Sequence, residues 1–177
     1  GSELDKILIF QHIGSVELAV YSLAIAPPDQ LKGLMKNVSF LAFPKFANNT
    51  NLTHKSGLFI KTLWVGAITS LLVSVYIIIA PWFFGFFFPQ YLESIIFSQV
   101  IAVSMIFAIP AIFLSTFLEA KAKTRQIYKY NTFYQIINLG TLILFIFWYG
   151  LWGAIIARLA TRIISLAYLF TLIKRID

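Results

Sequence analysis

The chain has 177 residues, of which 59% are hydrophobic and only 12% are charged, and its net charge is +7. Soluble globular domains carry about 25% charged residues, so this composition excludes an ordinary water-soluble domain and favours a lipid bilayer as the solvent. The chain has no cysteine and two histidines far apart in sequence, which excludes disulfides and thiolate metal sites and leaves little for a histidine-based site.

Long uncharged runs predict membrane-spanning helices. A helix needs about 20 apolar residues to cross a bilayer core, and residues 62–92, 94–118 and 130–157 contain no charged side chain. We therefore predict an all-α, polytopic membrane helix bundle that uses the whole chain, 1–177, as one transmembrane unit. The expected helices cover residues 4–13, 17–43, 57–87, 90–119, 126–149 and 152–174. The first has about half of the spanning length, so we expect its beginning to lie upstream.

Three of these predicted helices contain prolines. The second helix is expected to bend and lose helical geometry at "APPDQ", because Pro27 and Pro28 lack backbone donors. Pro81 and Pro110 should kink the third and fourth helices. A membrane helix tolerates a proline when neighbouring groups form hydrogen bonds with the carbonyl that the proline leaves without a donor.

The basic residues of the loops predict the orientation. The loops after the second and fourth helices, together with the C-terminal end, hold nine basic residues, whereas the three loops on the opposite side hold none. Under the positive-inside rule the basic side and the C-terminus are cytoplasmic. The nine residues are Lys45, Lys55, Lys61, Lys121, Lys123, Arg125, Lys129, Lys174 and Arg175.

Five basic residues remain inside the predicted helices: Lys6, Lys32, Lys36, Arg158 and Arg162. Arg158 and Arg162 stand four apart on one helix face, and Arg162 would lie about 15 Å inside the last helix, near the bilayer midplane. Exposure of a cation to lipid there costs at least about 3 kcal/mol, so Arg162 must face protein or water.

Two interpretations of these internal charges stay open. Basic side chains from at least two helices could line a water-filled cavity that receives an anion. Alternatively, they could form structural ion pairs, for example between Arg162 and Asp5 or Asp29. The flexible stem of Lys36 could also reach the cytoplasmic headgroups. Four amides are expected to form hydrogen bonds between helices: Gln99, Asn131, Gln135 and Asn138.

The sequence contains no pattern typical of an enzyme. It has no recognisable nucleophile–base pair, glycine-rich phosphate loop or cluster of metal ligands. We therefore expect no catalytic residue, no metal, no cofactor and no nucleic-acid partner.

The segment "LDKILIFQHIGSVELAVYSLA" resembles the seventh helix and the start of the eighth in bacterial polysaccharide flippases. These are the O-antigen and teichoic-acid exporters of the multidrug/oligosaccharidyl-lipid/polysaccharide (MOP, MATE-like) superfamily. The matching positions are Asp5, Lys6, Gly14, Tyr21 and Ala24.

Further motifs follow in the same order. "FLAFPKFA" resembles the Phe-Pro ending of the family's eighth helix, and "FFGFFFPQYLES" its Gly-x-x-Tyr turn, although Pro89 stands where a glycine is more usual. "EAKAKTR" is similar to the basic loop after the tenth helix, and "GLWGAIIARLATRI" to the start of the twelfth.

The resemblance implies that this chain is the second six-helix lobe of a flippase in the bacterial cytoplasmic membrane. A missing N-terminal lobe of the same protein would face it across a central cavity. The implied substrate is a polyprenyl-diphosphate-linked oligosaccharide, translocated by alternating access. Its anionic headgroup would be drawn by Arg158, Arg162, Lys32 and Lys6, with Asp5 holding Lys6 or an arginine in place.

Two other functions are compatible with the sequence. One is a drug/cation antiporter lobe of the same superfamily, which would require acidic residues in the cavity. The other is a membrane subunit or enzyme of cell-envelope polysaccharide assembly, which would require a carboxylate or histidine cluster at one membrane interface.

Overall fold

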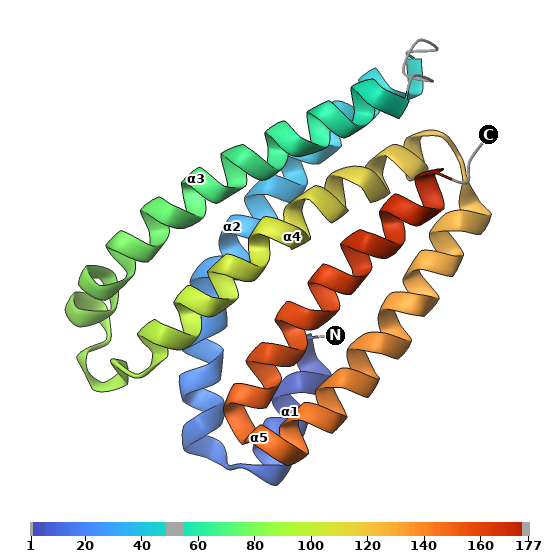
Figure 1. The fold of residues 1–177 in the computed structure, drawn as a ribbon. Helices are drawn as coiled ribbons and strands as arrows, with labels where there is room; N and C mark the ends of the chain where they lie inside the picture. Colours follow the sequence, from blue (N-terminus) through green and yellow to red (C-terminus); the bar gives the residue numbers. More distant parts are fainter. Residues whose placement is uncertain (1, 49–54, 175–177) are drawn as a thin grey trace.

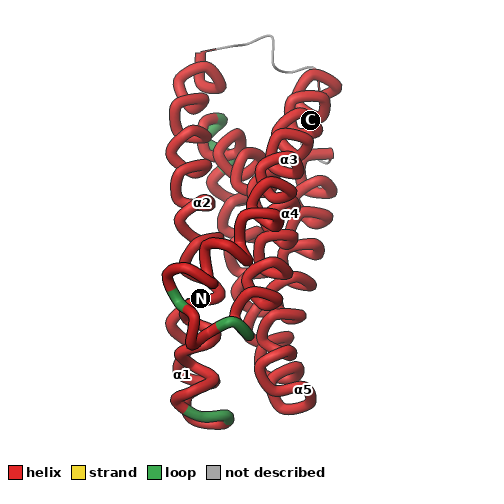
Figure 2. Tube along the Cα trace, turned by 90° about the vertical axis from the view of Figure 1, so that its left-hand side faces the viewer, coloured by secondary structure: helices red, strands yellow, loops and turns green. Residues whose placement is uncertain are grey.

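The computed structural model describes residues 2–48 and 55–174, and it describes the side chains of residues 4–37 and 57–174. Within these limits the chain is all-helical and contains no strand. The long helices are α2 (Ser15–Asn48), α3 (Lys55–Phe87), α4 (Ser94–Ala120) and α5 (Thr124–Lys174), and α1 (Ser2–His12) is short. Short loops, green in Figure 2, join α1 to α2, α3 to α4 and α4 to α5. The α3–α4 connection contains one turn of 3₁₀ helix, η2 (Pro89–Tyr91).

Three helices, α3, α4 and α5, are long and apolar enough by length and composition to cross a membrane. Their outward-facing side chains are large and hydrophobic, as lipid contact requires; on α3 they include Leu63, Trp64, Leu71, Ile78, Trp82 and Phe86. Helix α2 is less apolar because it carries Asp29, Lys32 and Lys36. These features indicate a membrane protein.

Helix α4 is the centre of the bundle. It packs against α2, α3 and α5 (Figure 1). Most of its small and apolar side chains are buried. One apolar core joins Tyr21, Ala24, Ile101 and Met105, and a second joins Leu58, Leu114 and Leu169 near the other end of the bundle. In each core, side chains of α4 therefore contact side chains that are far from them in the sequence.

Helix α5 is a hairpin of two helices. Gly150, with φ 57° and ψ −131°, interrupts the helical geometry, and the chain reverses direction there (Figure 1). The two predicted helices at 126–149 and 152–174 are thus confirmed as separate segments. The hydroxyls of Thr141 and Thr161 join them at 3.0 Å.

The turns that the structure describes lie at two ends of the bundle, on the sides predicted for them. The α1–α2, α3–α4 and Gly150 turns lie at one end, and the α4–α5 turn lies at the other (Figure 1). Helix α4 ends in a Schellman motif, in which Lys123 N–H donates to Leu118 O at 3.1 Å and Ala122 takes a φ of 51°. Residues 49–54 of the loop predicted after the second helix fall outside the described residues, as do Arg175 and the side chains of Lys45 and Lys55.

The prediction that Pro27 and Pro28 interrupt the second helix was wrong. Helix α2 is helical through both prolines and continues to Asn48, five residues beyond the expected end at 43. The helix changes direction along its length (Figure 1), so the bend is accommodated without loss of helical geometry.

The carbonyl that Pro81 leaves without its helical donor is satisfied from another helix. Pro81 cannot donate to Ile77 O, and Gln99 Nε2 on α4 donates to that carbonyl at 3.0 Å. The interhelical role predicted for Gln99 is confirmed. The hydroxyls of Thr62, Thr69 and Ser70 donate to carbonyls four residues earlier on α3, which keeps them bonded within a helix that faces lipid.

Candidate functional site

A hollow of about 420 Å³ lies between α1, α2 and both segments of α5. Four basic and two acidic side chains surround it, so its lining carries a net charge of +2. Helices α1, α2 and α5 each supply charged groups, which agrees with the expectation that cations from at least two helices meet inside the bundle. The lining residues are Asp5, Asp29, Lys32, Gly33, Lys36, Tyr134, Asn138, Arg158 and Arg162.

The second segment of α5 positions both arginines. Their four-residue spacing places them on one helix face, and that face turns toward α2 and α4 rather than toward lipid. The two residues are only 7% and 6% exposed, and each also lines the hollow. The expectation that Arg162 faces protein and a cavity is therefore confirmed.

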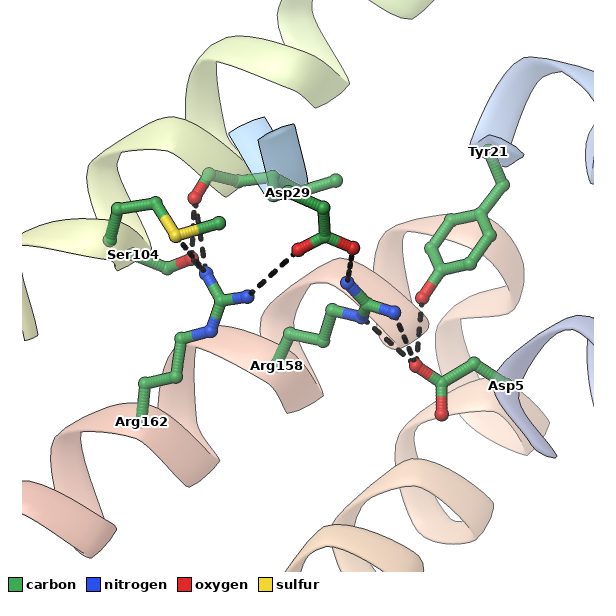
Figure 3. A network of polar contacts seen from close by, with 8 residues as sticks. Asp5, Tyr21, Asp29, Ser104, Arg158 and Arg162 are labelled. Carbon is green, nitrogen blue, oxygen red and sulfur yellow. Dashed lines mark hydrogen bonds and ion pairs between the residues drawn. The ribbon is translucent and has the colours of Figure 1, made fainter. Parts of the chain in front are cut away.

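Arg158 forms a tight ion pair with Asp5. Its Nε and Nη2 both approach Asp5 Oδ2 at 2.9 Å, and Tyr21 donates its hydroxyl hydrogen to the same oxygen at 3.0 Å (Figure 3). The guanidinium carbon of Arg158 also lies 5.4 Å from the centre of the Tyr21 ring. Asp5 Oδ1 is buried and has no hydrogen-bond partner among the described residues. The burial of the charged Arg158 is thus explained largely by its ion pair with Asp5.

Arg162 has a different environment. Its Nη1 donates to Ser104 Oγ and to Ile101 O, the latter at 3.4 Å, and lies 3.5 Å from Met105 Sδ (Figure 3). These three groups on α4 are neutral. Among the described residues its nearest carboxylate oxygen is Asp29 Oδ1, 4.0 Å from Nη2. The charge of Arg162 is therefore held in position by α4 but only weakly neutralised.

Asp29 lies between the two arginines. Its Oδ2 is 3.8 Å from Arg158 Nη1, and its Oδ1 is 4.0 Å from Arg162 Nη2 (Figure 3). Both distances exceed that of a hydrogen bond. The Asp29 side chain is 35% exposed, in contrast to 3% for Asp5. Asp29 is thus a loose partner of both arginines.

The lysines are placed differently from one another. Lys32, which is predicted to belong to the site, lines the hollow one turn after Asp29. Lys36, whose stem is expected to reach toward the headgroups, lines the hollow as well. Lys6, which was predicted to belong to the same site, is not among the lining residues. Successive helical residues point about 100° apart, so the orientation that directs Asp5 to Arg158 turns Lys6 away from the hollow.

Several members of the site were not singled out from the sequence. Asp29 was named only as a possible ion-pair partner of Arg162, Asn138 only as a residue joining helices, and Tyr21 only as a position of the flippase resemblance. The available signal for Asp29 and Lys32 was their i, i+3 spacing, which places both on one face of α2. Nothing in the sequence indicated that Ser104 on α4 would contact Arg162.

The arginines and lysines that line the hollow are suited to binding an anion. Arginine offers a planar fork of N–H donors that matches carboxylate and phosphate oxygens, and lysine adds a flexible point charge. Among the described residues, no three His, Cys, Asp or Glu side chains gather in a way that could hold a metal ion.

No family model, curated protein or solved structure matches this chain. The similarity to polysaccharide flippases therefore remains an interpretation of the sequence motifs.

Proposed function

We propose that this chain is the C-terminal lobe of a bacterial lipid-linked oligosaccharide flippase. In this proposal the hollow binds the diphosphate of a polyprenyl-diphosphate-linked repeat unit while the sugars cross the cytoplasmic membrane. An N-terminal lobe supplied by the same protein would complete the cavity, and the C-terminus would be cytoplasmic.

The observation that carries the proposal is the excess of positive charge around the hollow. Arg162 is buried within the bundle, is fixed by neutral groups on α4, and has no carboxylate oxygen closer than 4.0 Å among the described residues. Ionised side chains inside a membrane protein are costly and generally functional. A phosphate oxygen entering the hollow would supply the close negative partner that Arg162 lacks, and charge-assisted bonds of this kind are strong.

A drug/cation antiporter lobe is less well supported. That function requires a carboxylate that can exchange a proton or sodium ion for the transported cation. Asp5, the more deeply buried acid of the hollow, is already neutralised by Arg158 at 2.9 Å, and the surplus of positive charge would repel a cationic substrate.

The test is Arg162→Ala in the intact protein that contains this chain, with export measured as polysaccharide at the cell surface. We expect export to be abolished. Removal of this cation leaves no closely paired buried carboxylate behind, so the protein should still fold and accumulate. Arg125→Ala removes the same charge from an exposed position in the α4–α5 region and should export normally.

Protein abundance in the membrane, measured by immunoblot, separates a transport defect from a folding defect. Arg162→Lys retains the charge without the fork of donors and should restore export only in part. Normal export by Arg162→Ala would show that Arg162 has a structural role, and the proposed function would lose its main support.

A further inference from the structure

The two acids of the hollow are held in different ways, although both contact Arg158. Asp5 is buried, accepts two N–H groups of Arg158 at 2.9 Å, and accepts the Tyr21 hydroxyl at 3.0 Å. Asp29 has no hydrogen bond to either arginine and lies 3.8 and 4.0 Å from them. Its side chain is 35% exposed and lines the hollow. Asp5 is thus a fixed counter-ion, and Asp29 is a weakly held one.

Asp29 occupies the place that an anionic ligand would take. A phosphate oxygen that approaches both arginines from the hollow must enter the space between their Nη atoms, where the carboxylate of Asp29 now lies (Figure 3). Two like charges in that space repel each other, while the charge-assisted bonds from Arg162 to the ligand would be shorter than the present contacts. Ligand and carboxylate therefore compete for the same cations.

The parts of helix α2 before and after the two prolines are packed differently. Before the prolines, its side chains Val20, Tyr21, Ala24 and Ile25 are buried in the core, and Ser94 Oγ on α4 donates to Val20 O at 3.1 Å. After the prolines, the side chains from 30 to 37 are all half-buried or exposed, and Met35 is the one that packs against the core cluster. Asp29 directly follows Pro28, at the junction of the anchored part and the loosely packed part.

We propose that Asp29 is an exchangeable counter-ion, displaced from Arg158 and Arg162 by the anionic headgroup of the substrate. The inference rests on the proposed function, because it assumes that the hollow receives a phosphate-bearing ligand. Displacement removes the ion pairs that join α2 to α5, and the part of α2 after Pro28 is then released. Substrate binding is thereby linked to movement of one wall of the hollow.

The first test measures the affinity of the intact protein for inorganic pyrophosphate, by calorimetry in nanodiscs of neutral lipid. Asp29→Asn keeps the size of the side chain but removes the competing charge, so we expect pyrophosphate to bind about tenfold more tightly than to wild type. Asp29→Glu retains the competing charge and should stay within about twofold of wild type. Arg162→Ala should abolish binding.

These outcomes separate the inference from the proposed function. Pyrophosphate binding that requires Arg162 but is unchanged or weakened by Asp29→Asn would overturn the exchange and leave the proposed function standing. No detectable pyrophosphate binding by wild type and Asp29→Asn would count against both.

The second test measures the distance between spin labels on introduced cysteines at Leu34 of α2 and Ile163 of α5. Both positions are exposed, and the chain has no cysteine of its own. Pyrophosphate should shift the distance distribution in wild type, and Asp29→Asn should show the shifted distribution without ligand. An Asp29→Asn distribution identical to that of ligand-free wild type would refute the release of α2.

Discussion

At the scale of single residues, the most closely bonded group of polar side chains around the hollow consists of Asp5, Tyr21 and Arg158. Asp5 Oδ2 accepts three donors, two from Arg158 and one from Tyr21, whereas Oδ1 has no hydrogen-bond partner among the described residues. A buried ion pair of this kind offsets the desolvation of both partners, and removal of one partner leaves the other charge uncompensated. Loss of either partner therefore weakens the contact of α1 with α2 and α5.

Asp5→Asn should destabilise the protein by about 3 kcal/mol, because it leaves the buried Arg158 guanidinium without its close carboxylate. Thermal unfolding of the purified intact protein measures the effect. Tyr21→Phe, which removes a single hydrogen bond, should cost only about 1 kcal/mol. The double variant Asp5→Asn, Arg158→Gln should recover much of the loss, and an Asp5→Asn protein that melts at the wild-type temperature would contradict the structural role of the pair.

At the scale of the elements, the hairpin within α5 determines where the arginines lie. Gly150 reverses the chain, and Gly153 allows the second segment to pass close to the first. A Cβ on Gly153 would overlap the backbone carbonyl oxygen of Phe145, closer than two such atoms can approach. Close approach of the two segments therefore requires glycine at this position, and it sets the position at which Arg158 and Arg162 reach α1, α2 and α4.

Gly153→Ala should destabilise the hairpin by about 3 kcal/mol, since the backbone of residues 145–146 must move to admit the methyl group. The matched control is Gly140→Ala on the first segment of α5, where nothing lies within 4 Å of the added Cβ. This control should be neutral or slightly stabilising, because alanine favours helix over glycine. Both are compared by fluorescence-detected gel filtration after heating, and equal stability of the two variants would show that the hairpin tolerates wider spacing.

At the scale of the whole molecule, the bundle has two chemically different ends. The turns at α1–α2, α3–α4 and Gly150 carry no lysine or arginine, and exposed aromatics such as Trp82, Trp148 and Trp152 lie in the helices near them. The α4–α5 turn and the first residues of α5 carry Lys121, Lys123, Arg125 and Lys129. This asymmetry predicts that the basic end is cytoplasmic.

Labelling of introduced cysteines in cells tests this orientation, because the chain contributes no cysteine of its own. Gln90→Cys, at an exposed position of η2, should react with a membrane-impermeant maleimide in spheroplasts. Lys123→Cys, in the α4–α5 turn, should react only after the membrane is permeabilised. The reverse pattern would invert the topology.

The sequence by itself determined the class of the fold, the boundaries of most helices and the sorting of the turns between two ends. These properties depend on local signals, namely apolar runs, glycines, and the uneven placement of lysine and arginine. The four-residue spacing of Arg158 and Arg162 similarly specified that they share a face, because helical periodicity is local.

Only the tertiary structure decided which charges meet. Asp5 and Arg158 are 153 positions apart, and their pairing depends on the rotation of α1, α2 and α5 about their axes and on their packing against α4. The same rotations place Lys36 at the hollow, exclude Lys6, and set Asp29 between the two arginines. Helical periodicity relates residues within one helix, but it contains no information on how separate helices are rotated against one another.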